Sequence, residues 1–198
     1  GSIGRGPGEY LLSLVYCIDE KSGTIYLRDM GNVIKVFSRT GQFLRSFSVK
    51  EFGDNIKNIE IFNSKLFIQY ASESESSVYE WIFCDTTGNV IKKQPRHLDK
   101  FATNWGGPYP SYHFKNVLFY YNYYTDTVFS ISPDLTEYPS FIISPGEHRL
   151  PRSFLSPEQL LSNKYLKIDR IFETNDFFII HYLYKKYELA IVNKHNHE

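Results

Sequence analysis

Apolar and polar residues alternate along short segments of this chain, and polar turns separate the segments. In the stretch VIKVFSRTGQFLRSF, residues 33–47, two such segments flank a turn that contains Gly41. Alternation with a period of two is typical of β-strands, and a short turn with glycine is typical of a hairpin. The pattern therefore predicts a β-hairpin in this stretch.

A weaker copy of this hairpin returns downstream as IFCDTTGNVIKK, residues 82–93. Gly88 lies 88 − 41 = 47 positions after Gly41, and a further 47 positions take Asp85 to Ser132 in FSISPDLTEY. Asp and Ser side chains bond their own backbone in turns, so each copy reads as strand, turn and strand. A repeat of this length is typical of one blade of a β-propeller.

The expected strands group into three sets of four and a last set of three. The sets cover about residues 11–49, 56–93, 109–143 and 166–193. We expect each set to be one antiparallel blade of a single partial propeller domain over residues 1–198. The expected fold class is all-β: a β-propeller-like array of about three and three-quarter blades in an open or partial ring.

One short helix is expected between the third and fourth blades, in the segment SFLSPEQLLSNKYL. Ser156 is suited to be the N-cap, Pro157 takes the first helical position, and Gln159 completes a capping box. Asn163 lies near the expected end. The sequence therefore predicts a helical insert over residues 156–163.

The composition supports strands and argues against a nucleic-acid partner. Aromatic residues make up 17% of the chain, and they favour half-buried strands over helices. Lys plus Arg and Asp plus Glu number 22 each, so no broad positive field is present to attract phosphates. No apolar run approaches the roughly 18 residues that cross a bilayer, and no leader opens the chain, so we expect the chain as given to be soluble.

Two cysteines, Cys17 and Cys84, lie in apolar strand contexts, VYCID and IFCDT. We expect them to be separate buried thiols. A disulfide between them, or a role as metal ligands, is the alternative that the sequence leaves open.

Motifs that carry catalysis are absent from the sequence. The histidines share no ligand spacing apart from His195 and His197, a pair more typical of a tail than of a metal site, so we expect no metal, no cofactor and no catalytic residue. Glu60, Asp169 and Glu173 lie on or beside expected inner strands. They either project into a central channel or hold ordinary solvent-facing or hydrogen-bonded positions.

The best candidate ligand-binding residues are Trp105, Tyr109, Tyr112 and His113, in and after the connector FATNWGGPYP. Exposed aromatic rings stack on sugars or on peptide side chains, so the expected partner is a carbohydrate or a protein. Core packing between blades is the competing interpretation of the same residues.

The first third of the chain resembles NHL-type propeller repeats, in the stretch TIYLRDMGNVIKVFSRTGQFLRSF. In such repeats an Asp, an Asn and a final Gly punctuate the blade, and Asp29, Asn32 and Gly41 occupy those places here. The departure is at Val33 and Ile34, where the repeat usually has a basic residue.

The motifs GRGPGEY, YYTDTVFSIS and IISPGEHRLP resemble those of the six-bladed β-propeller lipoproteins of Bacteroidetes, a family largely of unknown function. The resemblance implies a cell-envelope location, periplasmic or at the outer membrane, with membrane contact only through a lipid anchor on a full-length precursor. It also implies that about two blades would follow the last strand here, so that this chain is a partial propeller.

Two functional hypotheses follow. The first is a non-catalytic binding or scaffold propeller of the bacterial cell envelope. The alternative is a propeller-type hydrolase or lyase whose acids and histidines come from several inner strands of the central channel. In either case we expect an unfinished last sheet with an open edge. The chain is then either a fragment of a larger propeller, or an arc that a second copy completes by two-fold pairing.

Overall fold

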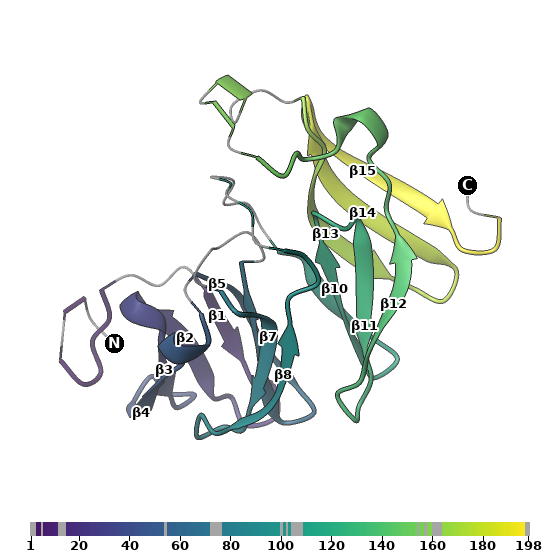
Figure 1. Cartoon of the computed structure of the whole chain (residues 1–198). Coiled ribbons are helices and arrows are strands. Elements are labelled where there is room, and N and C mark those ends of the chain that lie inside the picture. The colour runs from purple at the N-terminus through teal and green to yellow at the C-terminus, as the bar shows by residue number, and fades with distance from the viewer. Residues whose placement is uncertain are drawn as a thin grey trace. The chain divides into compact units, whose positions relative to one another are not determined.

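The computed structural model describes residues 3–4, 6–11, 15–53, 55–71, 77–99, 101, 103, 109–153, 155–156, 158–159 and 164–196. Within this part of the chain, fifteen strands form three four-stranded sheets and one three-stranded sheet, all antiparallel (Figure 1). The predicted all-β array of blades is therefore confirmed. The chain divides into two compact units, Gly1–Lys100 and Phe101–Glu198.

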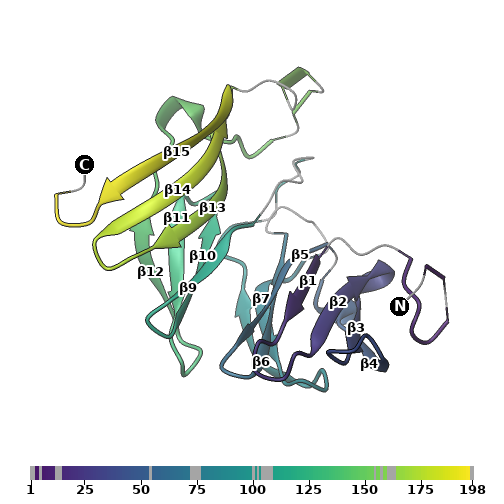
Figure 2. The ribbon, with the colours of Figure 1, turned by 180° about the vertical axis from the view of Figure 1, so that it is seen from behind.

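The first unit holds two sheets whose strands follow one another in sequence order. These strands are β1 (Val15–Ile18), β2 (Ile25–Asp29), β3 (Val33–Phe37), β4 (Phe43–Ser48), β5 (Ile56–Phe62), β6 (Lys65–Tyr70), β7 (Tyr79–Cys84) and β8 (Val90–Pro95). Single 3₁₀ turns, η1 (Met30–Asn32) and η2 (Lys50–Phe52), precede β3 and β5. The first strands of the two sheets, β1 and β5, lie against each other (Figure 2).

The second unit repeats this plan. Its strands are β9 (Ser111–Phe114), β10 (Val117–Asn122), β11 (Thr127–Ile131), β12 (Glu137–Ile142), β13 (Lys167–Glu173), β14 (Phe177–Tyr184) and β15 (Lys186–Asn193). A 3₁₀ turn, η3 (Gly146–His148), lies between β12 and β13. The first strands β9 and β13 again lie against each other, and the last sheet stops at its third strand.

Burial explains why the middle strands are so aromatic. In β10, VLFYYN, every residue after the first is buried, so both faces of the strand are covered. In β4 and β8, the last strands of their sheets, every second residue is exposed instead. A sheet covered on both faces through its middle strands is what stacked propeller blades produce.

Asp29 and Asn32, two of the residues that mark the NHL-type repeat, form hydrogen bonds at the two ends of the first blade. Asp29 Oδ1 accepts hydrogen bonds from Leu11 N (2.9 Å) and Met30 N (2.8 Å), which fixes the chain before β1. Asn32, with a left-handed φ of 55°, donates from Nδ2 to Gly53 O (2.8 Å) in the connection to the next sheet. Their roles are therefore structural.

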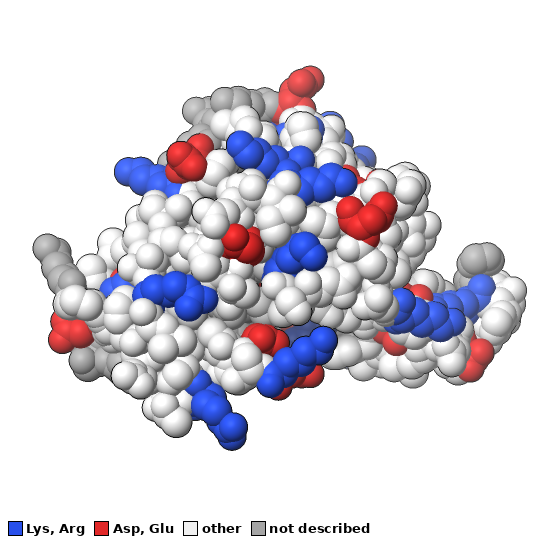
Figure 3. Space-filling model, turned by 90° about the horizontal axis from the view of Figure 1, so that it is seen from below, with Lys and Arg blue, Asp and Glu red and all other residues white. Residues whose placement is uncertain are grey.

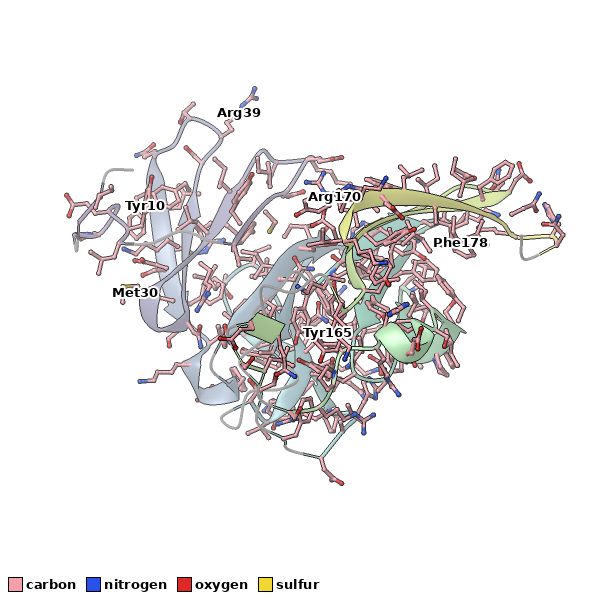
Figure 4. The ribbon with its side chains drawn as sticks, turned by 90° about the horizontal axis from the view of Figure 1, so that it is seen from above. Tyr10, Met30, Arg39, Tyr165, Arg170 and Phe178 are labelled. Carbon is pink, nitrogen blue, oxygen red and sulfur yellow. The ribbon has the colours of Figure 1, made fainter. Side chains whose placement is uncertain are left out.

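The turn predicted at Ser38, Asp85 and Ser132 forms in all three places. Asp85 Oδ1 accepts from Thr87 N (2.8 Å) and Asn89 N (3.0 Å). Its carboxylate also accepts from Thr87 Oγ1 (2.6 Å) and Asn89 Nδ2 (2.9 Å), and these side-chain bonds above all lower the pKa of the Asp85 carboxyl. Ser38 Oγ accepts from the backbone at the equivalent turn, and Ser132 Oγ donates to the backbone at its own. Arg39 extends outward from the first of these turns (Figure 4).

Both cysteines are free, as predicted. Cys17 is half-buried and Cys84 is fully buried, and both belong to the apolar core of the first unit. Burial raises the pKa of each thiol to about 12, with neighbouring carboxylates adding to the effect.

The predicted capping box is present, while most of the helical insert lies outside the described residues. Ser156 N donates to Gln159 Oε1 (2.8 Å), and Gln159 N donates to Ser156 Oγ (3.2 Å). Glu158 and Gln159 are helical; Pro157 and residues 160–163 are outside the described part. None of the helical residues that the structure describes forms a helix long and apolar enough to span a membrane.

Candidate functional site

Three connections meet at one end of the second unit, which we call the connector end: the described residues among 123–126, 143–166 and 184–186. Ile143 N donates to Asp126 O (2.9 Å), which places the start of the long connector beside the β10–β11 turn. Leu183 pairs with Lys167, so the β14–β15 turn lies beside the end of the same connector. Antiparallel strands return each connection of this kind to the same end of the sheet.

Two arginines fasten the connector to the β10–β11 turn. Arg149 Nε lies 3.0 Å from Asp126 Oδ2, and the Nη2 atoms of Arg149 and Arg152 donate to Tyr124 O at 3.0 and 2.7 Å. Burial raises the pKa of the Asp126 carboxyl, although both arginines act in the opposite direction. These charges therefore serve to position the connector.

An open pocket of about 570 Å³ lies at this end, lined by Glu147, His148, Lys164, Tyr184 and Lys185. Its volume is in the range of small-molecule sites. The rings of His148 and Tyr184 pack against each other, with centroids 4.4 Å apart. Lys185 Nζ lies 5.1 Å from the Tyr184 ring centroid, a cation–π distance.

Local structure holds these groups in place. His148 ends the 3₁₀ turn η3, and its carbonyl accepts from Leu166 N (2.9 Å), which closes the connector on itself. Lys185 occupies a left-handed turn position, with φ 59°, directly after Tyr184. Tyr165, next to Lys164, is buried, and Figure 4 shows it among the packed side chains of this unit.

The pocket offers an aromatic platform and an excess of positive charge. Among its described lining residues, two lysines accompany one acid, Glu147, whose Oε1 lies 3.7 Å from His148 Nε2. Aromatic faces stack on the apolar faces of sugar rings and other cyclic groups. Ammonium groups bind carboxylate, sulfate or phosphate as point charges. The arrangement is suited to binding a polar, ring-containing ligand.

A second group of titratable residues lies on the last sheet. His181 Nδ1 is 2.9 Å from Asp169 Oδ2, and the Tyr187 ring stacks flat on the imidazole, with centroids 5.2 Å apart. Both members of the pair are about one-third exposed. An ionised Asp169 favours a proton on Nδ1 and leaves Nε2 as the acceptor, the arrangement of a general base.

A third group is structural. Lys194 forms an ion pair with Glu173, and its Nζ lies 4.5 and 4.7 Å from the ring centroids of Phe114 and Phe178. Burial and the nearby Glu173 carboxylate raise the pKa of the Tyr112 hydroxyl. The Phe114 and Phe178 rings and the Glu173 carboxylate already contact the Lys194 ammonium inside the unit. We therefore assign Lys194 no role in ligand binding.

Two of the four residues proposed from sequence for ligand binding are packed inside the second unit. Tyr109 and Tyr112 are buried, with 5% and 8% of their surface exposed. Tyr109 packs edge-on to Tyr123, and Tyr112 stacks on Phe119 with centroids 4.9 Å apart. Both rings therefore pack against neighbouring rings, the arrangement of the competing interpretation. A binding role stays a prediction for all four residues: Tyr109, Tyr112, His113 and Trp105.

Of these last two residues, His113 is exposed on β9, while Trp105 lies outside the described part of the chain. The pocket residues went unnoticed in the sequence because they come from two segments that lie far apart along the chain: the long connector and the β14–β15 turn. One signal was available: Lys185 and Lys186 follow the aromatic strand FFIIHYLY directly, which places charge beside an aromatic strand end.

The three carboxylates expected on inner strands do lie on the first strands of their sheets. Glu60 on β5 accepts from Asn58 Nδ2 (3.2 Å), while Asp169 and Glu173 on β13 contact His181 and Lys194. Each of the three carboxylates has a hydrogen-bond or ion-pair partner. This favours ordinary hydrogen-bonded positions over projection into a central channel. Among the described residues, no group of three or more His, Cys, Asp or Glu side chains is placed to hold a metal ion.

Charges of both signs are interspersed on the face shown in Figure 3. This agrees with equal numbers of acidic and basic residues in the sequence. The positive pocket at the connector end is thus a local feature of a chain whose formal net charge is zero.

Sheets of this kind, covered on both faces and joined in sequence order, define a protein of the β-propeller class. The chain belongs to the family described as "Domain of unknown function (DUF4934)", whose profile matches residues 1–198. No curated protein matches this sequence.

Solved structures share the fold. A Bacteroides fragilis protein assigned as exported is 16% identical, with a TM-score of 0.62, over 99% of this chain and 59% of that one. BamB from Moraxella catarrhalis is 11% identical, with a TM-score of 0.58, over 92% of this chain and 50% of that one. A catalytically inactive virginiamycin B lyase from Staphylococcus aureus with quinupristin is 10% identical, with a TM-score of 0.51, over 90% of this chain and 54% of that one.

The chain therefore spans between half and three-fifths of the length of these structures. At this level of identity, the likeness extends to the fold alone.

Proposed function

We propose that this chain is a non-catalytic binding or scaffold propeller of the bacterial cell envelope, with a carbohydrate or protein ligand held at the connector-end pocket. The observation that carries the proposal is the pocket itself, in which Tyr184 and His148 form a platform beside Lys164 and Lys185. These groups supply stacking and charge, which are the interactions of a binding site.

The envelope location is supported by the likeness to the Bacteroides fragilis protein assigned as exported. It is also supported by the resemblance of GRGPGEY and IISPGEHRLP to the six-bladed lipoproteins of Bacteroidetes. We extend the proposal accordingly: these four sheets are part of a longer, six-bladed propeller that a lipid anchor holds at the membrane.

Calorimetric titration of a panel of neutral and acidic oligosaccharides and peptides tests the binding role. At least one probe should bind, and Tyr184→Ala should weaken it about tenfold or more, since stacking and cation–π contacts are lost together. Tyr138→Ala is the matched control, because Tyr138 is an exposed tyrosine of the same unit on β12. If no probe binds, or if both variants bind as well as the original chain, the proposed binding site is wrong.

Fractionation of cells that express the natural full-length protein tests the location. We expect the protein in the membrane fraction, released by detergent and not by salt, because an acyl chain anchors it through apolar burial. Recovery in the cytosolic fraction would contradict the envelope assignment. It would leave the binding experiment unaffected.

A second candidate function, a hydrolase or lyase, is favoured by the Asp169–His181 pair. A carboxylate that orients an imidazole is a common way to build a general base. Incubation with polysaccharides and cyclic peptides, followed by mass spectrometry of products, tests this. Turnover that His181→Gln abolishes, while Tyr184→Ala leaves it in place, would establish catalysis at the second group of residues.

A further inference from the structure

We propose that the ligand class of the connector-end pocket is an acidic saccharide, a pyranose ring that bears a carboxylate. The inference rests on the proposed binding function and narrows its ligand. Two features of the pocket lead to it: the kind of surface that its rings present, and the balance of charge around them.

The ring surface favours a sugar over a peptide side chain. Among the residues that the structure describes, the pocket's lining comprises two aromatic-type rings, His148 and Tyr184, and three charged side chains, and none of these five residues is aliphatic. Peptide anchors bury in well-packed pockets from which water is excluded, whereas this pocket is open to solvent. A pyranose instead needs one flat aromatic face for its C–H groups and polar neighbours for its hydroxyls. Tyr184, braced by His148 at 4.4 Å, provides such a face.

The charge balance favours an acidic sugar over a neutral one. Among the described lining residues, Lys164 and Lys185 outnumber the one acid, Glu147, and that carboxylate faces His148 at 3.7 Å. Both lysines are exposed, so a charged substituent on a ring reaches their ammonium groups from solvent. The nearby arginines add nothing to the pocket, because Arg149 and Arg152 are bound to Tyr124 O.

The placement of the lysines also matters. Lys164 lies at the end of the connector and Lys185 at the tip of the β14–β15 turn, so they reach the pocket from two separate segments. A carboxylate on a stacked ring is therefore met from more than one direction. Each contact of this kind is a charge-assisted hydrogen bond, about twice as strong as a neutral one.

Calorimetric titration of the whole chain with trigalacturonic acid and with its methyl ester is the test. The two probes share ring, linkage and length and differ in charge. We expect the acid to bind about tenfold more tightly than the ester. A higher salt concentration should reduce this difference in affinity, because salt screens exposed charges. Lys164→Gln and Lys185→Gln should each weaken binding of the acid severalfold and leave binding of the ester unchanged. Lys21→Gln, at an exposed turn of the first unit, is the control.

The outcomes separate this inference from the proposed function. Equal binding of acid and ester, still lost in Tyr184→Ala, overturns the acidic assignment and leaves the binding pocket standing. Triglutamate that binds as tightly as the trisaccharide overturns the saccharide assignment. Failure of both trisaccharides overturns the inference, and failure of every probe in the wider panel overturns the proposed function as well.

Discussion

Lys35 Nζ lies 2.9 Å from Asp29 Oδ2, and only 11% and 9% of the two side chains are exposed. Lys35 Nζ also donates to Glu9 O. The pair therefore ties β3 to the end of β2 and to the segment that precedes β1. Removing one partner of a buried ion pair leaves the other charge without compensation.

We expect Lys35→Met to lower the free energy of unfolding by about 3 kcal/mol, the low end for a buried pair, because Asp29 keeps its two backbone donors. Urea unfolding followed by tryptophan fluorescence measures the change. Lys21→Met, at an exposed turn, should have little effect. A loss under about 1 kcal/mol at Lys35 would mean that the pair contributes no more than a surface ion pair.

Gly88 is the second test of the fold, because two independent constraints act on it. Its φ is 100°, and a Cβ there would lie 2.5 Å from the Cγ of Phe47. Gly41 occupies the equivalent turn one repeat earlier, has φ 79°, and has open space around it. We expect Gly88→Ala to destabilise the first unit by about 2–3 kcal/mol and Gly41→Ala by about 1 kcal/mol. Equal losses of stability in the two variants would show that the Phe47 side chain moves away from the new Cβ at no energetic cost.

Because the Asp85 carboxylate is hydrogen-bonded in its turn, we predict that the free energy of unfolding decreases as the pH becomes acidic. Hydrogen bonds from Thr87 and Asn89 lower the pKa of this carboxyl below the ordinary value for Asp, about 3.9. Its contribution to stability is therefore present above about pH 4 and is lost as the pH falls through the lowered pKa. Asp85→Asn should flatten the loss of stability between about pH 4 and pH 2, as measured by urea unfolding at each pH.

The control for this prediction is Asp99→Asn, which removes one acidic charge at an exposed position after β8. If both substitutions change the acid limb of the stability profile to the same extent, net charge and not the turn is responsible.

We predict that Cys17 and Cys84 react slowly with thiol reagents in the folded chain. The thiolate is the reactive species, and burial raises the pKa of Cys17 and Cys84 to about 12. We expect slow modification of the native chain by a chromogenic disulfide reagent at pH 8, and two thiols titrated at once in denaturant. Fewer than two thiols in denaturant, with intermolecular oxidation excluded, would contradict the free state of both.

The fold was accessible from the sequence because its signals are local. The turns at Ser38, Asp85 and Ser132 form from side chains that bond atoms within four positions, so each was visible in a short window. The two-residue period and the 47-residue repeat also predicted three sets of four strands and a last set of three, which is how the described strands group into sheets.

The pocket was not accessible in this way, because its residues come from two connections. His148 meets Tyr184 across the long connector and a whole hairpin, and no local pattern specifies that contact. The same limit explains Tyr112, which alternation assigns to a face without saying whether another ring, here Phe119, already covers it.

The open edge of the last sheet is the final feature that makes a prediction. Among the described strands β15 pairs with β14 alone, although its eight residues offer hydrogen-bonding groups on both edges. Its alternate side chains Tyr187, Leu189 and Ile191 are 65%, 57% and 59% exposed. Exposed, unpaired apolar strands are templates for another strand.

When residues 1–198 are produced without the further blades proposed above, we expect two copies to pair through β15 in an antiparallel, two-fold arrangement. With Leu189 at the symmetry axis, Tyr187 of each copy faces Ile191 of the other, so aromatic and β-branched side chains meet on one face. Light scattering coupled to size exclusion should give about twice the 23.2 kDa of one chain. Leu189→Lys should return the mass to that of a monomer, whereas Leu44→Lys, at an exposed position of β4, should not. A stable monomer of the original chain at micromolar concentration would contradict the pairing and show that this apolar face is tolerated in water.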